Sequence, residues 1–128
     1  MKIKEFTITM GLFDKDTKRQ EIGTLDAYKI CINYLMSITD GATITEGKGI
    51  YKHDDGEIVI EPTFIIQLSF IEKPVVLEII KELKTLFNQE SIVLAETVKD
   101  SALVWGRCAF IPFDKIYWIE LQNRLRKN

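Results

Sequence analysis

Apolar and polar residues alternate over residues 3–12, near the start of the chain. The apolar positions share one parity and threonines lie between them: Phe6, Ile8, Met10 and Leu12 against Thr7 and Thr9. A period of two places the two sets on opposite faces of an extended backbone. The pattern therefore predicts a half-buried strand over 3–12, with a polar loop at 14–20 after it.

The same alternation predicts two more strands, at 42–52 and 57–71, joined by a hairpin turn. The turn contains Asp55-Gly56, one of the strongest short-range hairpin signals. Gly47 and Gly49 interrupt the first of these strands, which indicates a bulge or a place where another group approaches the backbone. In the second strand, one face is expected to carry the apolar residues Ile58, Ile60, Phe64, Ile66, Leu68 and Phe70.

Two other stretches carry apolar residues at helical spacing. The first begins at Gly23-Thr24, with Thr24 as the expected N-cap, and stops at Asp40-Gly41. Its expected buried face is Leu25, Tyr28, Ile32, Leu35 and Met36. The second has Pro74 in its first turn, where proline is tolerated. Its expected buried face is Val75, Ile79, Ile80, Leu83, Leu86 and Phe87.

A fourth strand is expected over 91–98, so the order is strand, helix, strand, strand, helix, strand. This is the split βαβ order of a ferredoxin-like sandwich, an α+β fold whose antiparallel sheet carries two helices on one face. A C-terminal strand at 102–111 and a helix from Asp114 are expected to follow. Because 128 residues fit one domain, we expect residues 1–128 to form a single ligand-binding domain. The open face of the sheet is expected to meet water or another chain.

The charge and composition of the chain limit the kinds of molecule that it is expected to bind. The 17 Lys and Arg residues nearly cancel the 19 Asp and Glu residues, which argues against long nucleic acid but permits a small phosphorylated ligand. No stretch reaches the roughly 18 apolar residues of a membrane span, and no signal peptide is expected at the start. We therefore expect a cytoplasmic protein of a bacterial host cell.

The chain has two cysteines, Cys31 and Cys108, each in an apolar stretch. Both are expected to be buried free thiols.

Residues for catalysis are sparse. The single histidine, His53, lies in a turn, and the chain has no zinc-type Cys/His spacing and no phosphate-binding glycine motif. A catalytic histidine needs an orienting acid and a nucleophile or substrate proton within reach. Two aspartates follow His53, but nothing else in the sequence indicates a nucleophile or a substrate proton. We therefore expect a binding protein rather than an enzyme, without a metal or a cofactor.

Two places offer candidate binding residues. Arg107 follows Trp105-Gly106 in an otherwise apolar stretch, and it is either a strand-edge cation or a phosphate anchor beside a stacking aromatic. Asn88-Gln89-Glu90-Ser91 either caps the end of a helix or supplies directional donors and acceptors to a sugar or a base. The residues alone leave both alternatives open.

Three stretches resemble a known family. They are Thr7–Thr17 (TITMGLFDKDT), Gly49–Tyr51 with the hairpin at 55–59, and Leu86–Ile92 (LFNQESI). Together they are similar to the phage-encoded Thoeris anti-defence family of sponges for cyclic ADP-ribose signals. The resemblance covers roughly residues 5–98 and contains no catalytic signature.

The resemblance implies a function and a site. Such a protein would bind a cyclic ADP-ribose isomer, made by TIR-domain proteins of bacterial immunity, without cleaving it. It would be a homo-oligomer, a dimer or higher and possibly a hexamer, with ligand pockets between protomers. The implied ligand-binding residues are Arg107 at a phosphate, Phe87 or Trp105 at the adenine, and Asn88, Gln89 and Ser91 at ribose or base edges. The rival interpretations are a protein–protein interaction module that uses the open sheet face, and a small nucleotide hydrolase.

Overall fold

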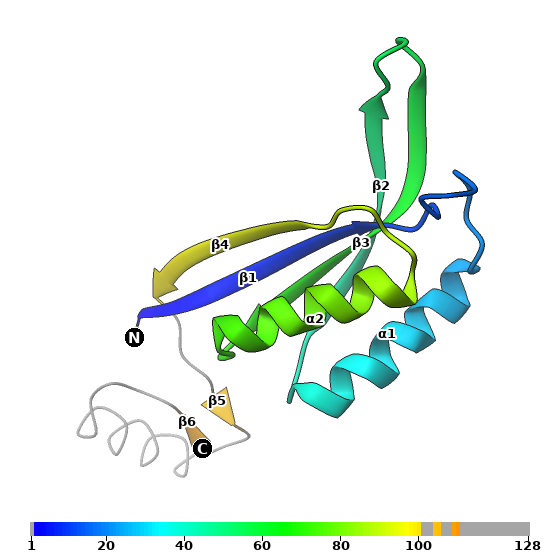
Figure 1. The fold of residues 1–128 in the computed structure, drawn as a ribbon. Helices are drawn as coiled ribbons and strands as arrows, with labels where there is room; N and C mark the ends of the chain where they lie inside the picture. The colour runs from blue at the N-terminus through cyan, green and yellow to red at the C-terminus, as the bar shows by residue number, and fades with distance from the viewer. Residues whose placement is uncertain (1, 101–103, 106–108, 111–128) are drawn as a thin grey trace, which may run out of the picture. The chain divides into compact units, whose positions relative to one another are not determined.

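The computed structural model describes residues 2–100, 104–105 and 109–110 (Figure 1). Its elements in chain order are β1 (Lys2–Gly11), α1 (Thr24–Ile38), β2 (Thr43–Lys52), β3 (Ile58–Ser69), α2 (Lys73–Leu86), β4 (Val93–Asp100), β5 (Val104–Trp105) and β6 (Ala109–Phe110). The chain divides into two compact units, Lys4–Thr97 and the remainder, 1–3 with 98–128. The single domain expected over 1–128 stays a prediction.

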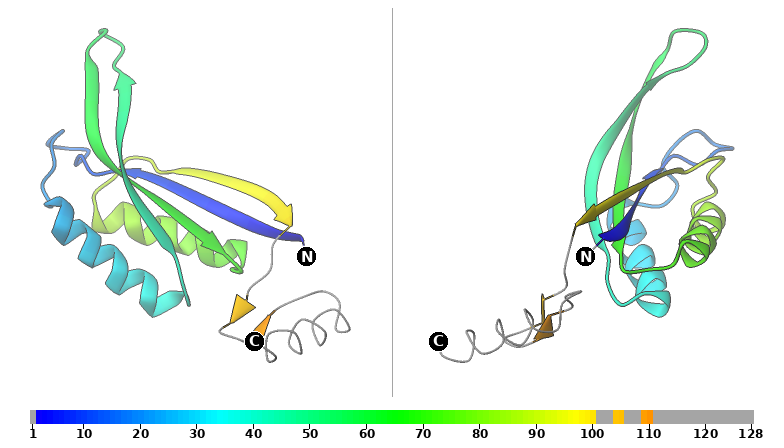
Figure 2. Two further views of the ribbon diagram at one scale, coloured as in Figure 1. Left: turned by 180° about the vertical axis from the view of Figure 1, so that it is seen from behind. Right: turned by 90° about the vertical axis from the view of Figure 1, so that its left-hand side faces the viewer.

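The first four strands form one open sheet in the order β2-β3-β1-β4. β3 pairs antiparallel with both of its neighbours, and α1 and α2 lie on the same face of the sheet (Figure 1 and Figure 2). This is the strand order of the ferredoxin-like sandwich, so the predicted α+β fold is confirmed. No helix in the part of the chain that the structure describes is both long and apolar enough to cross a bilayer.

The core lies between the sheet and the two helices. The alternate residues of β1 and the second half of β3 point toward the helices and are buried: Phe6, Ile8, Met10, Phe64, Ile66 and Leu68. The buried residues of the helices face the sheet: Ala27, Cys31 and Leu35 from α1, and Val76, Ile79 and Leu83 from α2. Cys31 is a buried free thiol, as expected, and burial raises its pKa to about 12.

The predicted buried face of α1 is only partly right. Leu35 is buried and Tyr28 packs against the core, as predicted. Leu25, Ile32 and Met36 are instead exposed, and Ala27 and Cys31 are buried in their place. The small side chains of Ala27 and Cys31 allow the helix to lie close to the sheet, which a line of larger residues would prevent.

The start of α1 also differs from the prediction. Gly23, and not Thr24, is the N-cap, and its carbonyl accepts the Ala27 N–H at 2.8 Å. The Thr24 hydroxyl oxygen instead accepts a hydrogen bond from Gln20 Nε2 at 2.9 Å. Thr24 therefore ties the preceding loop to the helix.

The apolar face predicted for β3 is buried over only part of its length. The pairing of β1 with β3 ends at Gly11 and Thr63, whereas β2 and β3 stay paired as far as Lys52 and Ile58. We call this two-stranded extension, residues 48–62, the β2–β3 arm; Figure 1 shows it projecting beyond the end of β1. Ile58 and Ile60 lie on the arm, where no helix covers them, and are 63% and 55% exposed.

The predicted strand at 102–111 is two strands in the described part of that segment. Val104 pairs with Phe110 and Trp105 with Ala109 in an antiparallel ladder, which a single continuous strand cannot form. Arg107, Cys108 and the helix expected from Asp114 lie outside the described residues.

Candidate functional site

A cleft of about 1010 Å³ opens on the face of the sheet away from the helices. Three regions that are distant in sequence line it: the end of β1 with the loop after it, the β2–β3 arm, and residues 89–93, which run from the end of α2 into β4. Its volume is of the size that small-molecule pockets have. The arm matters to the site because it supplies a wall that the four-stranded part of the sheet lacks.

Glu61 of β3 lies at the floor of the cleft and is half-buried. The backbone N–H of Phe13, just after β1, donates a hydrogen bond of 2.9 Å to Glu61 Oε2. A carboxylate that accepts a backbone N–H is held by a charge-assisted hydrogen bond, which is stronger than a neutral one. The structure thus fixes a negative charge at the base of the cleft.

Two glycines leave room for this floor. A Cβ atom on Gly11 would stand 2.3 Å from Glu61 Oε1, and one on Gly49 would stand 2.7 Å from Thr63 Oγ1. Gly49 pairs with Glu61 from β2, and Gly11 pairs with Thr63 from β1. Glycines on both flanks of β3 therefore allow its polar side chains to lie flat against the neighbouring strands, so that the cleft above them stays open.

Two ring side chains of the arm line the same cleft. The rings of Tyr51 and His53 meet edge to face, with centroids 5.5 Å apart. Burial raises the pKa of Tyr51, and the nearby negative charge of Glu61 raises it further. The phenol therefore stays protonated and can donate a hydrogen bond to a ligand.

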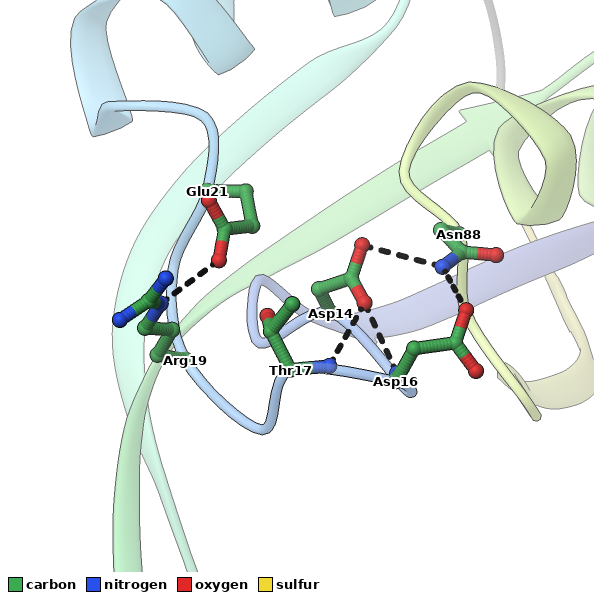
Figure 3. A network of polar contacts seen from close by, with 6 residues as sticks. All are labelled: Asp14, Asp16, Thr17, Arg19, Glu21 and Asn88. Carbon is green, nitrogen blue, oxygen red and sulfur yellow. Dashed lines mark hydrogen bonds and ion pairs between the residues drawn. The ribbon is translucent and has the colours of Figure 1, made fainter.

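The loop after β1 is fastened by a polar network (Figure 3). Asp14 Oδ1 accepts the N–H groups of Asp16 and Thr17, at 2.8 and 3.1 Å. Asn88 Nδ2 donates to Asp14 Oδ2 at 3.0 Å and to Asp16 Oδ2 at 2.8 Å. The hydrogen bond from Asn88 is the main reason that the pKa of Asp14 is lowered, and the two backbone N–H groups add to it.

Gln89 adds a hydrogen bond to the segment after β1. It is only 9% exposed, and its Nε2 donates to the carbonyl oxygen of Phe13 at 2.7 Å and to that of Phe87 at 3.1 Å. The segment between α2 and β4 is thereby joined to the segment after β1 that contacts Glu61.

The charges around the cleft are mainly negative. Its lining holds four carboxylates, Asp14, Glu57, Glu61 and Glu90, against two lysines, Lys15 and Lys18, with a histidine that is formally neutral at pH 7. Because like charges repel most strongly where water is partly excluded, this lining favours a cationic ligand over a doubly anionic one.

The ligand-binding residues expected from the sequence fall in different places. Gln89 and Ser91 line the cleft, whereas Phe87 packs in the core and Asn88 is bonded to the loop aspartates. Trp105 belongs to β5, and Arg107 lies outside the described residues. Their roles as ligand contacts stay predictions. Within the described ranges, no three His, Cys, Asp or Glu side chains gather as metal ligands would.

Sequence reasoning missed Glu61 and Tyr51 as site residues. Two signals pointed toward them: Gly49 was marked as a place of close approach to the backbone, and Glu61 stands at a polar position in an apolar strand. Neither signal says that Gly49 and Glu61 face each other, which follows only from the β2–β3 register.

Comparisons with known proteins locate the fold among solved structures. No protein-family model and no curated protein sequence matches the chain. A phage SAM lyase in complex with S-methyl-5′-thioadenosine is similar at a TM-score of 0.58 and 23% identity, over 77% of this chain and 85% of that one. The same kind of enzyme in its apo state matches at a TM-score of 0.53 and 23% identity, over 76% and 84%. CutA from Synechococcus elongatus matches at a TM-score of 0.51 and 9% identity, over 77% of each chain.

Proposed function

We propose that the cleft binds S-adenosylmethionine and breaks the bond between its sulfur and its amino-acid chain, releasing S-methyl-5′-thioadenosine. The observation that carries the proposal is the Glu61 carboxylate, held on the cleft floor by the Phe13 N–H in a lining with more negative than positive groups. S-adenosylmethionine carries a sulfonium cation, and a carboxylate attracts it strongly where the dielectric is low. The similarity to a phage SAM lyase with S-methyl-5′-thioadenosine bound supports the choice of ligand.

The proposed reaction requires few catalytic groups from the protein. When the carbon–sulfur bond breaks, sulfur keeps the electron pair and leaves as a neutral thioether, so no acid has to protonate the leaving group. The carbon of the amino-acid chain takes its new electron pair from the substrate's own carboxylate oxygen, which closes a lactone ring. The protein has to bind the substrate and orient it, which can itself supply a large part of a rate enhancement. Glu61 would face the sulfonium, and Tyr51, which stays protonated, would donate a hydrogen bond to the substrate. The scarcity of catalytic residues in the sequence suits such a reaction.

Sequestration of a cyclic ADP-ribose isomer without cleavage is the second proposal. The sequence resemblance supports it, and Lys15 and Lys18 offer two cations in the cleft to the phosphates of such a ligand. Against it stand the four carboxylates of the same lining. Both proposals imply an anti-defence role in the cytoplasm of an infected bacterial cell, through removal of an adenosine compound.

One experiment separates the two proposals. The purified chain is incubated with S-adenosylmethionine and, separately, with a cyclic ADP-ribose isomer, and binding is measured by calorimetry. The first reaction is stopped with acid and compared with a sample without protein, the second sample is heated to release the ligand, and the nucleosides in both are identified by chromatography. We expect S-methyl-5′-thioadenosine to accumulate and the cyclic ligand to give no binding heat. Tight binding of the cyclic ligand, with intact ligand recovered and S-adenosylmethionine untouched, would establish sequestration instead. If neither ligand binds, an interaction module becomes the better account.

We also propose that the β2–β3 arm packs against a second copy of the chain. Ile50 pairs with Ile60 on the arm, Ile58 shares their face, and all three are mostly exposed. Burying one such side chain stabilises an assembly by roughly 1.5–3 kcal/mol, and identical chains associate most often through closed symmetry. The same three isoleucines also line the cleft, so a copy docked against them would stand beside the ligand, as a pocket between protomers requires.

Light scattering after gel filtration tests this assembly. We expect the wild-type mass to be a multiple of 14.8 kDa and Ile58→Lys to reduce it to 14.8 kDa. Leu77→Lys is the matched control, because Leu77 is also half-exposed but lies on α2, away from the arm. A monomeric wild-type chain, or an Ile58→Lys variant of unchanged mass, would contradict the proposal.

A further inference from the structure

The Glu61 carboxylate is held by a hydrogen bond from a backbone segment without regular structure, and it occupies the space that Gly11 leaves by having no side chain. Oε2 accepts the Phe13 N–H, and Oε1 lies where any side chain on residue 11 would stand. Phe13 is two residues beyond the end of β1, so the sheet ladder does not hold it in place. Whatever fixes Phe13 therefore decides where the Glu61 charge lies.

The contacts of Phe13 show what fixes it. On one side, the Leu12 N–H donates to the Pro62 carbonyl at 2.9 Å. On the other side, the Phe13 carbonyl accepts from Gln89 Nε2 at 2.7 Å, the shortest hydrogen bond that Gln89 makes. The side chain of Gln89 is almost fully buried, and its second bond, to Phe87, ties it to the end of α2. Residue 13 is thus clamped between β3 and a glutamine anchored in the core.

We infer that Gln89 is a positioning residue for Glu61: it holds the Phe13 backbone from which the carboxylate takes its hydrogen bond. Gln89 acts through Phe13 and needs no contact with the ligand. The functional part of this inference rests on the proposed function, because only a cationic ligand responds strongly to the place of the Glu61 charge.

The test uses Gln89→Met, which keeps the length of the side chain and removes the N–H donor. We expect affinity for S-adenosylmethionine to fall about tenfold, the scale of one hydrogen bond to a charged group. Affinity for S-methyl-5′-thioadenosine, which has no sulfonium charge, should change less than about twofold on the same scale. If Gln89 had only a structural role, its replacement would lower the affinity for both ligands by the same factor. Gln89→Leu also removes the donor and adds no charge to the cleft, and it should shift the ratio of the two affinities in the same direction if Gln89→Met does not fold.

A double-mutant cycle with Glu61→Gln tests whether Gln89 acts through Glu61. In that background Gln89→Met should change the affinity ratio less than about twofold, because residues that act through one interaction are not additive. Gln20→Met is the control, since Gln20 bonds to Ile22 and Thr24 in the same loop and does not hold Phe13. An unchanged ratio in both Gln89 variants, or full additivity in the cycle, would overturn the inference.

A measurement without ligand keeps the two proposals distinguishable. The amide proton resonance of Phe13 reports its hydrogen bond to Glu61. In Gln89→Met we expect this resonance to move toward its position in Glu61→Gln, while Gln20→Met leaves it in place. If the wild type binds neither nucleoside, the proposed function has failed, and the Phe13 resonance alone decides whether Gln89 positions Glu61; a wild-type resonance in Gln89→Met would refute it.

Discussion

Replacing Gly11 with alanine is expected to leave the chain folded and to lower its affinity for S-adenosylmethionine about 30-fold, the equivalent of about 2 kcal/mol. The new Cβ would stand 2.3 Å from Oε1 and 2.4 Å from Cδ of Glu61. These atoms are the far end of a flexible side chain, so the carboxylate can swing away while the backbones of β1 and β3 stay where they are. The cost to folding is then small, and the cost to the site is the misplaced charge.

The size of the effect follows from electrostatics. A pair of opposite unit charges 4 Å apart gains about 4 kcal/mol at an effective dielectric constant near 20, and about 1 kcal/mol in bulk water. Glu61 is half-buried, so an intermediate value applies. Glu61→Gln removes the charge altogether and sets the benchmark that Gly11→Ala should approach.

Calorimetric titration and thermal unfolding of the same variants check this prediction. Gly47→Ala is the matched control: Gly47 lies in β2, and a Cβ there would meet only Ile65 Cδ1, at an ordinary distance of 3.9 Å. The control should bind like the wild type. Wild-type affinity in Gly11→Ala, with Glu61→Gln weakened, would mean that the position of the carboxylate matters less than its presence in the cleft.

The fold was predictable because short local sequence patterns identify most of its helices and strands. Three signals need no knowledge of the rest of the chain: the alternation in β1 and in the second half of β3, the Asp55-Gly56 turn, and Pro74 in the first turn of α2. Their order then leaves few topologies, of which the ferredoxin-like sandwich is one. The buried face of α2 was largely predictable as well, because Ile79 and Leu83 face the core with Phe87 beyond them.

The errors arose where the sequence carries apolar residues on more than one side. α1 has large apolar residues on one side and the smaller Ala27 and Cys31 on the other, and only close packing on the sheet favours the smaller set. In β3, alternation continues from Phe64 back to Ile58, although β1 and the helices no longer cover that end. A period of two identifies a strand but does not show where its neighbours stop.

The site was less predictable than the fold, because it depends on register and on irregular segments. Glu61, Gly11 and Gln89 come from three regions of the chain, and no spacing in the sequence connects them. The polar cluster at 88–91 was recognised as a candidate, but its side chains do something that neither alternative named: Asn88 and Gln89 hydrogen-bond to the loop after β1. Gln89 and Ser91 also line the cleft, so their contact with a ligand stays a prediction.

Phe64→Ala is expected to lower the free energy of unfolding by about 4 kcal/mol, within the usual range for a buried phenylalanine. Phe64 is fully buried in β3, and its ring meets that of Tyr28 edge to face, with centroids 6.1 Å apart. The truncation would leave a cavity between the sheet and α1 and remove this ring contact. Since domains of this size are stable by only about 5–15 kcal/mol, the loss is a large share of the total.

Thermal and urea unfolding, with Phe70→Ala as the control, test the assignment of the core. Phe70 follows β3 with the same parity as Phe64, and sequence alternation places both on one face, yet Phe70 is 46% exposed with φ of 58°. The left-handed conformation turns the chain out of the strand, so the Phe70 ring is not enclosed by the core. We expect Phe64→Ala to lower Tm by about 15 °C and Phe70→Ala to cost about 0.5 kcal/mol, as surface substitutions do. Equal losses in the two variants would mean that the core extends past the end of β3.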